Sequence, residues 1–177
     1  RGMVVTADGG KLFVNWRERS ADETLKMLNN MTDGVVSQFM QQHDYAFRIF
    51  SRSANTIRVL TMWDYEAGEP FVAFAGHRFG RPQSIPVDNC AQGGLASPID
   101  IKTGVLGRAQ AGHYASQDEF HDVHPDTGEQ IAGVAIPHWR ETVEGLLAIC
   151  GAMAYIPYVG WDVLVTPGGF AVTEGNS

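Results

Sequence analysis

The chain has 177 residues, of which 44% are hydrophobic, and its formal net charge is −7. This composition is typical of a globular protein, and the acidic balance argues against a nucleic-acid partner, whose phosphates need a basic face. No apolar run reaches the roughly 18 residues that span a bilayer, and no signal peptide precedes the first predicted strand. We therefore expect a soluble, cytoplasmic protein with neither a membrane nor a nucleic-acid partner.

The chain contains two cysteines. Cys90 and Cys150 are too few for a disulfide framework and lack zinc-ligand spacing, so both are expected to be buried thiols. The chain begins with Arg1 rather than Met and ends one residue after Asn176. We therefore expect a fragment of a longer polypeptide.

The first 40 residues predict a hairpin, a helix and a strand. Residues 2–16 predict two short strands around the turn at residues 8–10. Ser20 and Glu23 have the spacing of a capping box, and apolar residues recur at helical intervals to Met31, so an amphipathic helix is expected. Residues 35–40 predict a buried strand.

From residue 41 onward, the pattern predicts a sheet and one further helix. Residues 55–63 and 69–80 predict paired strands, and two more strands reverse at Thr103-Gly104. A surface loop is expected over residues 116–128, a helix over 137–156, and a closing hairpin that turns at residues 167–169. This order favours an α+β fold with antiparallel sheets.

The closing hairpin predicts a metal site. Glu174 and Asn176 are two residues apart and so point to one face of a strand, which Asp162 can reach from across the turn. Magnesium prefers oxygen ligands, commonly one or two carboxylates together with substrate phosphates. A surface hairpin with polar ends is the alternative interpretation.

Several segments together resemble the ATP-grasp ligases, most closely the sugar-transfer associated ATP-grasp proteins. They are "SANTIRVLT", "VDNCAQGGLASPIDIKTG", "HPDTG", "IPHW" and "VGWDVLVTPGGFAVTEGN". The pattern is also similar to that of the ribosomal-protein glutamate ligases. The resemblance implies an ATP-grasp fold of two α+β lobes that lacks its N-terminal part here. Residues 1–40 would belong to the small lobe with glycine loop and hinge strand, and residues 41–177 to the C-terminal lobe with the metal and phosphate site.

The resemblance implies an ATP-dependent carboxylate–amine ligase, or a ligase for a related nucleophile, acting through an acyl phosphate. Its partners would be a small-molecule or peptide carboxylate and an amine. It implies ATP and Mg²⁺, with Mn²⁺ as an alternative, and the metal ligands Asp162, Glu174 and Asn176. A nucleotide-binding module without catalysis and a non-enzymatic α+β interaction domain remain alternatives.

Catalytic and substrate-binding roles follow from the same resemblance. Arg58 and Arg78 would clamp phosphate or acyl phosphate through two-point contacts. Asn89 would assist at the tetrahedral intermediate or bind the phosphate on the metal side. Gly93 and Gly94 would let backbone amides approach the substrate. A salt bridge across the sheet is the alternative for Arg58, and the nearby Arg81 is an alternative to Arg78.

The nucleotide-binding assignments fall near the start of the chain. Gly9, Gly10 and Lys11 resemble the end of a glycine-rich loop over the phosphates, although a plain hairpin turn explains them equally well. Thr6 stands where the family usually carries a lysine, so Lys11 substitutes for it or the grip on the nucleotide is weaker. The hinge residues expected to contact adenine are Gln38, Phe39 and Met40, for which a plain core strand is the alternative.

Three histidines, His113, His121 and His124, cluster in sequence. Their spacing fits no standard zinc pattern, so we expect a solvent-exposed loop rather than a zinc site. His124, within "HPDTG", is nevertheless expected to border the acceptor pocket. Trp139 and Trp161 are expected in the core or at a lobe interface.

Overall fold

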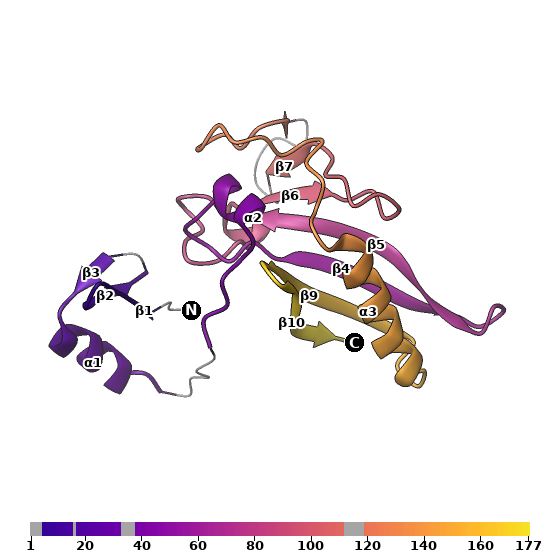
Figure 1. Ribbon diagram of the computed structural model, residues 1–177, viewed down its shortest axis with the longest axis horizontal. Coiled ribbons are helices and arrows are strands. Elements are labelled where there is room, and N and C mark those ends of the chain that lie inside the picture. Colours follow the sequence, from indigo (N-terminus) through magenta and orange to yellow (C-terminus); the bar gives the residue numbers. More distant parts are fainter. Residues whose placement is uncertain (1–4, 16, 33–37, 112–118) are drawn as a thin grey trace. The chain divides into compact units, whose positions relative to one another are not determined.

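The computed structural model describes residues 5–15, 17–32, 38–111 and 119–177. The chain divides into two compact units, Arg1–Gln41 and Gln42–Ser177, which are described separately below (Figure 1). Both combine helix with antiparallel sheet, so the predicted α+β fold is confirmed. The assignment of these units to two ATP-grasp lobes stays a prediction.

The first unit contains a three-stranded antiparallel sheet and one helix. The strands are β1 (Val5–Asp8), β2 (Lys11–Val14) and β3 (Arg17–Arg19), in that order, and the helix is α1 (Ala21–Asn29). Between β1 and β2, Gly9 and Gly10 have φ values of 54° and 79°. A two-residue hairpin turn of this kind needs positive φ at both positions, and the predicted hairpin is confirmed.

Helix α1 begins with the predicted capping box. Ser20 Oγ accepts the Glu23 backbone N–H at 3.2 Å, and Glu23 Oε2 accepts the Ser20 backbone N–H at 3.0 Å. Its apolar stripe is nevertheless exposed, and among the described residues of this unit only Val14 and Thr24 are buried. One helix on a three-stranded sheet is too small to enclose a sizeable core.

The predicted buried strand at residues 35–40 is wrong for its described part. Residues 35–37 lie outside the described ranges, and Gln38, Phe39 and Met40 are exposed without helical or strand pairing. These residues connect the two units, because the next unit begins at Gln42. The Gln42 side-chain amide is fixed there by the Ser53 carbonyl oxygen at 2.8 Å.

The second unit is built on a seven-stranded antiparallel sheet with the order β10-β9-β4-β5-β6-β7-β8. Its strands are β4 (Ile57–Asp64), β5 (Glu69–Phe79), β6 (Leu95–Pro98), β7 (Ala109–Ala111), β8 (Phe120–His121), β9 (Tyr158–Thr166) and β10 (Gly169–Asn176). The predicted β4–β5 and β9–β10 hairpins are confirmed. Residues 120–121, expected in a loop, instead add a short strand to the sheet edge by pairing with β7.

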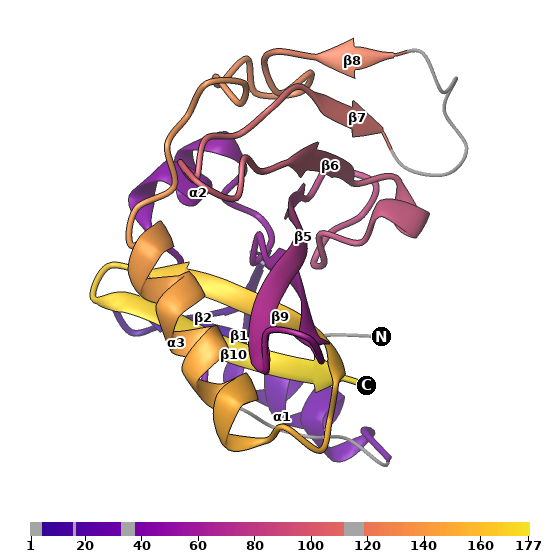
Figure 2. The ribbon, with the colours of Figure 1, turned by 90° about the vertical axis from the view of Figure 1, so that its right-hand side faces the viewer.

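Helices α2 (Asp44–Ile49) and α3 (Trp139–Ala152) and a short 3₁₀ helix, η1 (Cys90–Gln92), complete this unit. Helix α3, which the sequence predicts, packs against β4, β5 and β10, and Figure 2 shows it lying along the β9–β10 hairpin. The sequence analysis does not predict α2. That helix is too short for a periodic pattern, and it begins where His43 Nδ1 accepts the Tyr45 backbone N–H at 3.3 Å.

One face of the central strands forms the core. Alternation along β4 turns Ile57, Val59 and Thr61 toward α3, where Thr61 Oγ1 lies 3.1 Å from Cys150 Sγ. The core also contains the following buried side chains: Ala75, Phe79, Leu95, Leu106, Ile131, Trp139, Leu146, Trp161, Val163 and Val165. The intervening residue Arg58 therefore points to the opposite face.

A histidine without exposed surface lies in this core. His77 Nδ1 is 3.1 Å from the Arg78 carbonyl oxygen, which can only accept, so Nδ1 carries the proton. Nε2 then accepts the Tyr45 hydroxyl at 2.7 Å. Burial lowers the pKa of His77 to about 3, so the imidazole is neutral at physiological pH.

Replacement of this histidine should change how stability depends on pH. An unfolded histidine titrates near 6.5 and folded His77 near 3, so between these pH values the unfolded state binds one more proton. The stabilisation is fully present above pH 6.5 and is lost as the pH falls toward 3. From about pH 5.5 to about pH 4, urea unfolding should show the wild type losing about 1.4 kcal/mol more per pH unit than His77→Gln. Equal slopes would contradict a buried neutral His77.

Candidate functional site

Cross-strand pairing places charged side chains on the sheet face opposite α3, which we call the polar face. Residues directly opposite each other in antiparallel strands share a face. Asp162 on β9 is opposite Arg58 on β4, and Arg58 is opposite Gly76 on β5. Arg78 lies two residues beyond Gly76 and so points the same way. Arg58, Arg78 and Asp162, all predicted site residues, therefore come together.

Glu174 reaches the polar face through a β-bulge. The β9–β10 hairpin pairs Val172 with Val163 and then, one residue out of step, Glu174 with Asp162. Thr173 is the extra residue, and its Oγ1 donates to the Asp162 carbonyl oxygen at 2.9 Å. In an unbroken register Thr173 would lie opposite Asp162, and Glu174 would point to the other face. The bulge thus forms the acid pair.

Two guanidiniums share the Asp162 carboxylate. Arg58 Nε lies 2.7 Å from Oδ1 and Arg58 Nη2 lies 3.2 Å from Oδ2, and Arg78 Nη2 lies 3.0 Å from Oδ2. Asp162 is only 8% exposed, so solvent screens these ion pairs little. The salt bridge across the sheet that was the alternative for Arg58 is present.

Asp88 is a second buried carboxylate in this cluster, and the sequence analysis does not identify it. Its Oδ2 accepts the Thr56 backbone N–H at 2.7 Å and the Thr56 hydroxyl at 2.6 Å, and it lies 3.6 Å from Arg78 Nε. Arg78 also donates to the Thr56 hydroxyl oxygen. The only signal in the sequence is an acid immediately before Asn89, a predicted site residue.

Burial and neighbouring charges shift the pKa values of both Asp88 and Arg78. Burial raises the pKa of Asp88 above its ordinary value, against the opposing effects of the Arg78 charge and the Thr56 hydrogen bonds. Burial by itself would lower the pKa of Arg78, but the carboxylates of Asp88 and Asp162 outweigh it and raise that pKa. Arg78 therefore remains a cation fixed between two acids.

The predicted metal ligands fit a divalent cation in their chemistry. Asn176 is opposite Gly160 and so shares the polar face with Asp162 and Glu174. Oδ1 of Asp162 is buried and accepts no hydrogen bond, because the nearby Arg58 N–H groups are not aligned with it. A hard cation would use this oxygen. Among the described residues, no group of three or more His, Cys, Asp or Glu side chains is arranged to hold a metal ion, at this place or elsewhere.

The loop that carries Asn89 and the glycine pair lies beside Asp88. Asn89 Oδ1 accepts the Ala91 backbone N–H at 2.9 Å and so begins η1, which ends at Gly93 with φ 93°. A Cβ at Gly94 would lie 2.6 Å from the Asp88 carbonyl oxygen. These residues hold the loop against the cluster, and their predicted catalytic and substrate-binding roles stay predictions.

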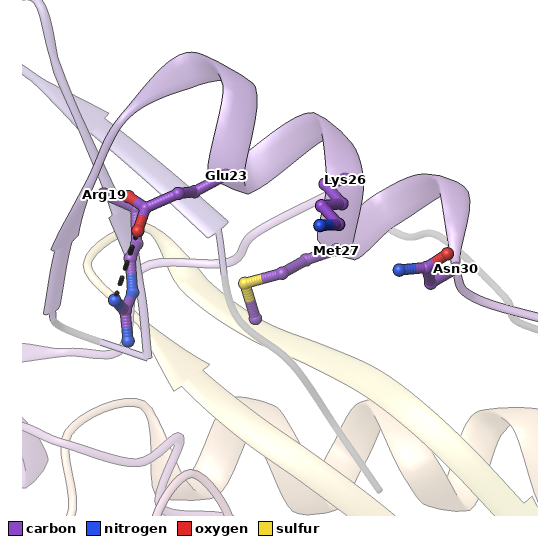
Figure 3. Close-up of a pocket in the computed structure, with 5 residues that line it drawn as sticks. All are labelled: Arg19, Glu23, Lys26, Met27 and Asn30. Carbon is purple, nitrogen blue, oxygen red and sulfur yellow. Dashed lines mark ion pairs between the residues drawn. The ribbon is translucent and has the colours of Figure 1, made fainter.

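Predicted nucleotide contacts lie in the first unit. Gly9 and Gly10 form the β1–β2 turn, and Lys11 Nζ lies 2.9 Å from Glu18 Oε2. The predicted hinge residues, Gln38 to Met40, are exposed. A shallow pocket in the same unit is lined by residues of β3, α1 and the residue after it, namely Arg19, Glu23, Lys26, Met27 and Asn30 (Figure 3). None of these is a predicted site residue.

The histidine segment differs from the predicted exposed loop. His124 has no exposed surface, because its ring stacks on Phe50 with centroids 5.3 Å apart. Its Nε2 donates to the Gly80 carbonyl oxygen at 2.9 Å, its Nδ1 accepts the Asp126 backbone N–H at 3.3 Å, and burial lowers its pKa. Both ring nitrogens are occupied, and the predicted contact with the acceptor stays a prediction. His113 lies outside the described residues.

Arg81, the alternative to Arg78, lies apart from the polar-face cluster. Its Nε is 2.7 Å and its Nη2 3.2 Å from the two carboxylate oxygens of Asp126. The structure therefore groups Arg78, rather than Arg81, with Arg58 and Asp162.

In the part of the chain that the structure describes, no helix has the length and apolar character needed to cross a bilayer.

Comparison with known proteins identifies one relationship. The family described as sugar-transfer associated ATP-grasp has a model that matches residues 20–177, which is most of the chain. This match includes Arg58, Arg78, Asp162 and Glu174. No curated protein and no solved structure matches the chain.

Thr56→Val should lower the free energy of unfolding, because it removes the hydroxyl that joins Asp88 to Arg78. Hydrogen bonds to charged groups contribute about 1.5–3 kcal/mol each, and we expect a loss of this order in urea unfolding at neutral pH. Thr166→Val is the matched control, since Thr166 is also half-buried and its hydroxyl makes no hydrogen bond within the described residues. Equal losses in both variants would show that the Thr56 hydroxyl does not support the cluster.

Proposed function

The chain belongs to the sugar-transfer associated ATP-grasp family, and we propose that it is an ATP-dependent ligase that joins a carboxylate to an amine or a related nucleophile. The observation that carries this proposal is the cross-strand row of Glu174, Asp162 and Arg58, with Arg78 beside it. It combines oxygen ligands for a cation with guanidiniums for an anion. Phosphoryl transfer requires both, since it depends mostly on positioning and on neutralising phosphate charge.

Asp162, Glu174 and Asn176 would hold Mg²⁺. Their carboxylate and amide oxygens are the ligand type that Mg²⁺ prefers, and the register supports their placement on one face. When bound, the cation would supply positive charge to the phosphate oxygens of ATP. Mn²⁺ takes similar oxygen ligands, which makes it a suitable probe of the same site.

The two arginines would hold the anionic groups of the reactants. Each guanidinium can make two parallel hydrogen bonds to a phosphate or carboxylate, which fixes the orientation of the bound group. Arg78 is held by Asp88 and Thr56, so its side chain is in place before a ligand arrives. Preorganised charge of this kind stabilises a transition state without a reorganisation cost.

In the proposed reaction, a carboxylate oxygen of the donor attacks the γ-phosphorus of ATP, and ADP leaves. The acceptor nitrogen then attacks the acyl carbon of the resulting acyl phosphate, inorganic phosphate leaves, and the nitrogen gives up a proton. The side-chain amide of Asn89 is proposed to assist as negative charge develops on the acyl oxygen.

A catalytically impaired nucleotide-binding module is the second candidate. It is favoured by Thr6, where the family usually has a lysine, and by the ion pair that engages Lys11 with Glu18 at 2.9 Å. Such a module would bind the nucleotide but not turn it over. Binding alone would raise its melting temperature, because any ligand that binds only the native state stabilises it.

Two measurements test these candidates. Mg²⁺ with a non-hydrolysable ATP analogue should raise the melting temperature if either is correct, and the absence of any shift would favour a non-enzymatic interaction domain. ADP release from ATP that depends on an added carboxylate and amine would support the ligase. Binding without such release, over a panel of acids, would support the impaired module.

Glu174→Gln should weaken binding of the Mg²⁺–nucleotide complex by tenfold or more, because an amide replaces a charged ligand while an exposed position leaves no core cavity. Isothermal titration with the non-hydrolysable analogue and Mg²⁺ measures this change. Glu144→Gln on α3 is the matched control, since it removes the same charge from an exposed position on the other side of the sheet. Unchanged affinity in Glu174→Gln would exclude Glu174 as a metal ligand.

A further inference from the structure

We propose that Arg58 is a movable counter-ion of Asp162, which leaves this carboxylate when the divalent cation binds and then contacts the anionic tail of the nucleotide. This inference rests on the proposed function, because it assigns the order of events at the same site. Its consequence is that the cation alone binds weakly and that the cation and nucleotide bind together.

The position of Arg58 conflicts with that of a cation on Asp162. Arg58 Nε lies 2.7 Å from Oδ1, the buried oxygen that accepts no hydrogen bond and that a cation would use as a ligand. Magnesium binds oxygen at about 2.1 Å, so a guanidinium and a divalent cation on the same oxygen would lie within strong electrostatic repulsion. One of the two must leave.

Arg78 is the arginine that stays. Its Nε is 3.6 Å from the Asp88 carboxylate and 3.1 Å from the Thr56 hydroxyl oxygen, in addition to its contact with Asp162. Its side chain is 23% exposed, against 36% for Arg58. Movement of Arg78 would leave the buried Asp88 without its counter-charge, which is costly.

Arg58 has only one acidic partner among the described residues, and that partner is Asp162. Its Nη1 lies over Gly160, where a Cβ would approach to 2.9 Å. The missing side chain at Gly160 thus leaves the space that Arg58 occupies in this structure. Since the guanidinium is at the end of a flexible chain and partly exposed, it can turn away without disturbing the core.

A displaced guanidinium needs a new anion. The phosphates of a nucleotide bound beside the cation supply one, in the two-point geometry that guanidinium favours. Binding of the cation breaks the Arg58–Asp162 ion pair, and the nucleotide phosphates then form a new ion pair with Arg58. Each ligand therefore favours the binding of the other. Without nucleotide, the cation must displace a guanidinium that gains no new partner.

Binding of Mn²⁺, followed by electron paramagnetic resonance of the free ion, tests this proposal. Without nucleotide, Arg58→Gln should bind Mn²⁺ at least tenfold more tightly than the wild type, because the competing charge is gone. The same variant should bind the non-hydrolysable ATP analogue with Mn²⁺ more weakly, because the phosphate contact is gone. These opposite changes are not expected from a merely structural role of Arg58.

Two further variants complete the experiment. Gly160→Ala keeps the charge but crowds Arg58 Nη1, so it should change Mn²⁺ affinity in the same direction by a smaller factor. It provides the comparison if Arg58→Gln does not fold. Arg140→Gln is the matched control, since Arg140 is exposed on α3 on the other side of the sheet and should leave both affinities unchanged.

The outcomes separate this inference from the proposed function. If the wild type binds the analogue with Mn²⁺, but neither Arg58→Gln nor Gly160→Ala binds Mn²⁺ more tightly alone, Arg58 is not a counter-ion that must leave and the proposed function stands. If the wild type binds no Mn²⁺ even with the analogue, both proposals are wrong. A gain of Mn²⁺ affinity in Arg140→Gln equal to that in Arg58→Gln would reduce the effect to net charge and would also overturn the inference.

Discussion

The ionic cluster of the polar face depends on one carboxylate that two guanidiniums share. Asp162 contacts both Arg58 and Arg78 on the polar face and cannot neutralise two positive charges by itself. Asp88 removes this imbalance on the side of Arg78. The cluster is therefore asymmetric: Arg78 has two carboxylate partners, Asp88 and Asp162, whereas Arg58 has only Asp162 among the described residues. The proposed function, in which this site would admit a metal ion and a polyanion, fits such a division, because a fixed charge positions a ligand and an exchangeable charge makes room for one.

The two faces of β5 support each other. His77 in the core contacts the carbonyl oxygen of Arg78, whose side chain lies on the polar face, and Tyr45 of α2 donates to the same imidazole. Just before Thr56, the buried Asn55 donates to backbone carbonyls in and directly after α2. The ionic cluster thus rests on buried polar groups whose hydrogen bonds are satisfied, which restricts the positions of its side chains.

Local patterns in the sequence predict most elements of the fold, including the β1–β2, β4–β5 and β9–β10 hairpins and the capping box of α1. Strand alternation and the family resemblance also single out Arg58, Arg78 and Asp162, which the structure brings together. Asp88 is not predicted because it contacts Thr56 from a loop, 32 residues away, where no periodicity exists. His124 is predicted to be exposed because its sequence neighbours are polar, whereas its burial is set by segments that are distant along the chain. Contacts of this kind depend on tertiary packing.

Because of the bulge at Thr173, the number of residues in β10 decides whether the Glu174 carboxylate lies on the polar face. Loss of the bulged residue would restore a regular ladder and keep Glu174 opposite Asp162, while relaxing the local twist. Insertion of one residue before Glu174 would instead rotate that carboxylate to the α3 side. Deletions and insertions at one position would therefore have opposite consequences, although each alters the amino-acid composition very little. Among related sequences, the length of the strand after the turn should therefore be compared along with residue identity when the proposed metal site is assessed.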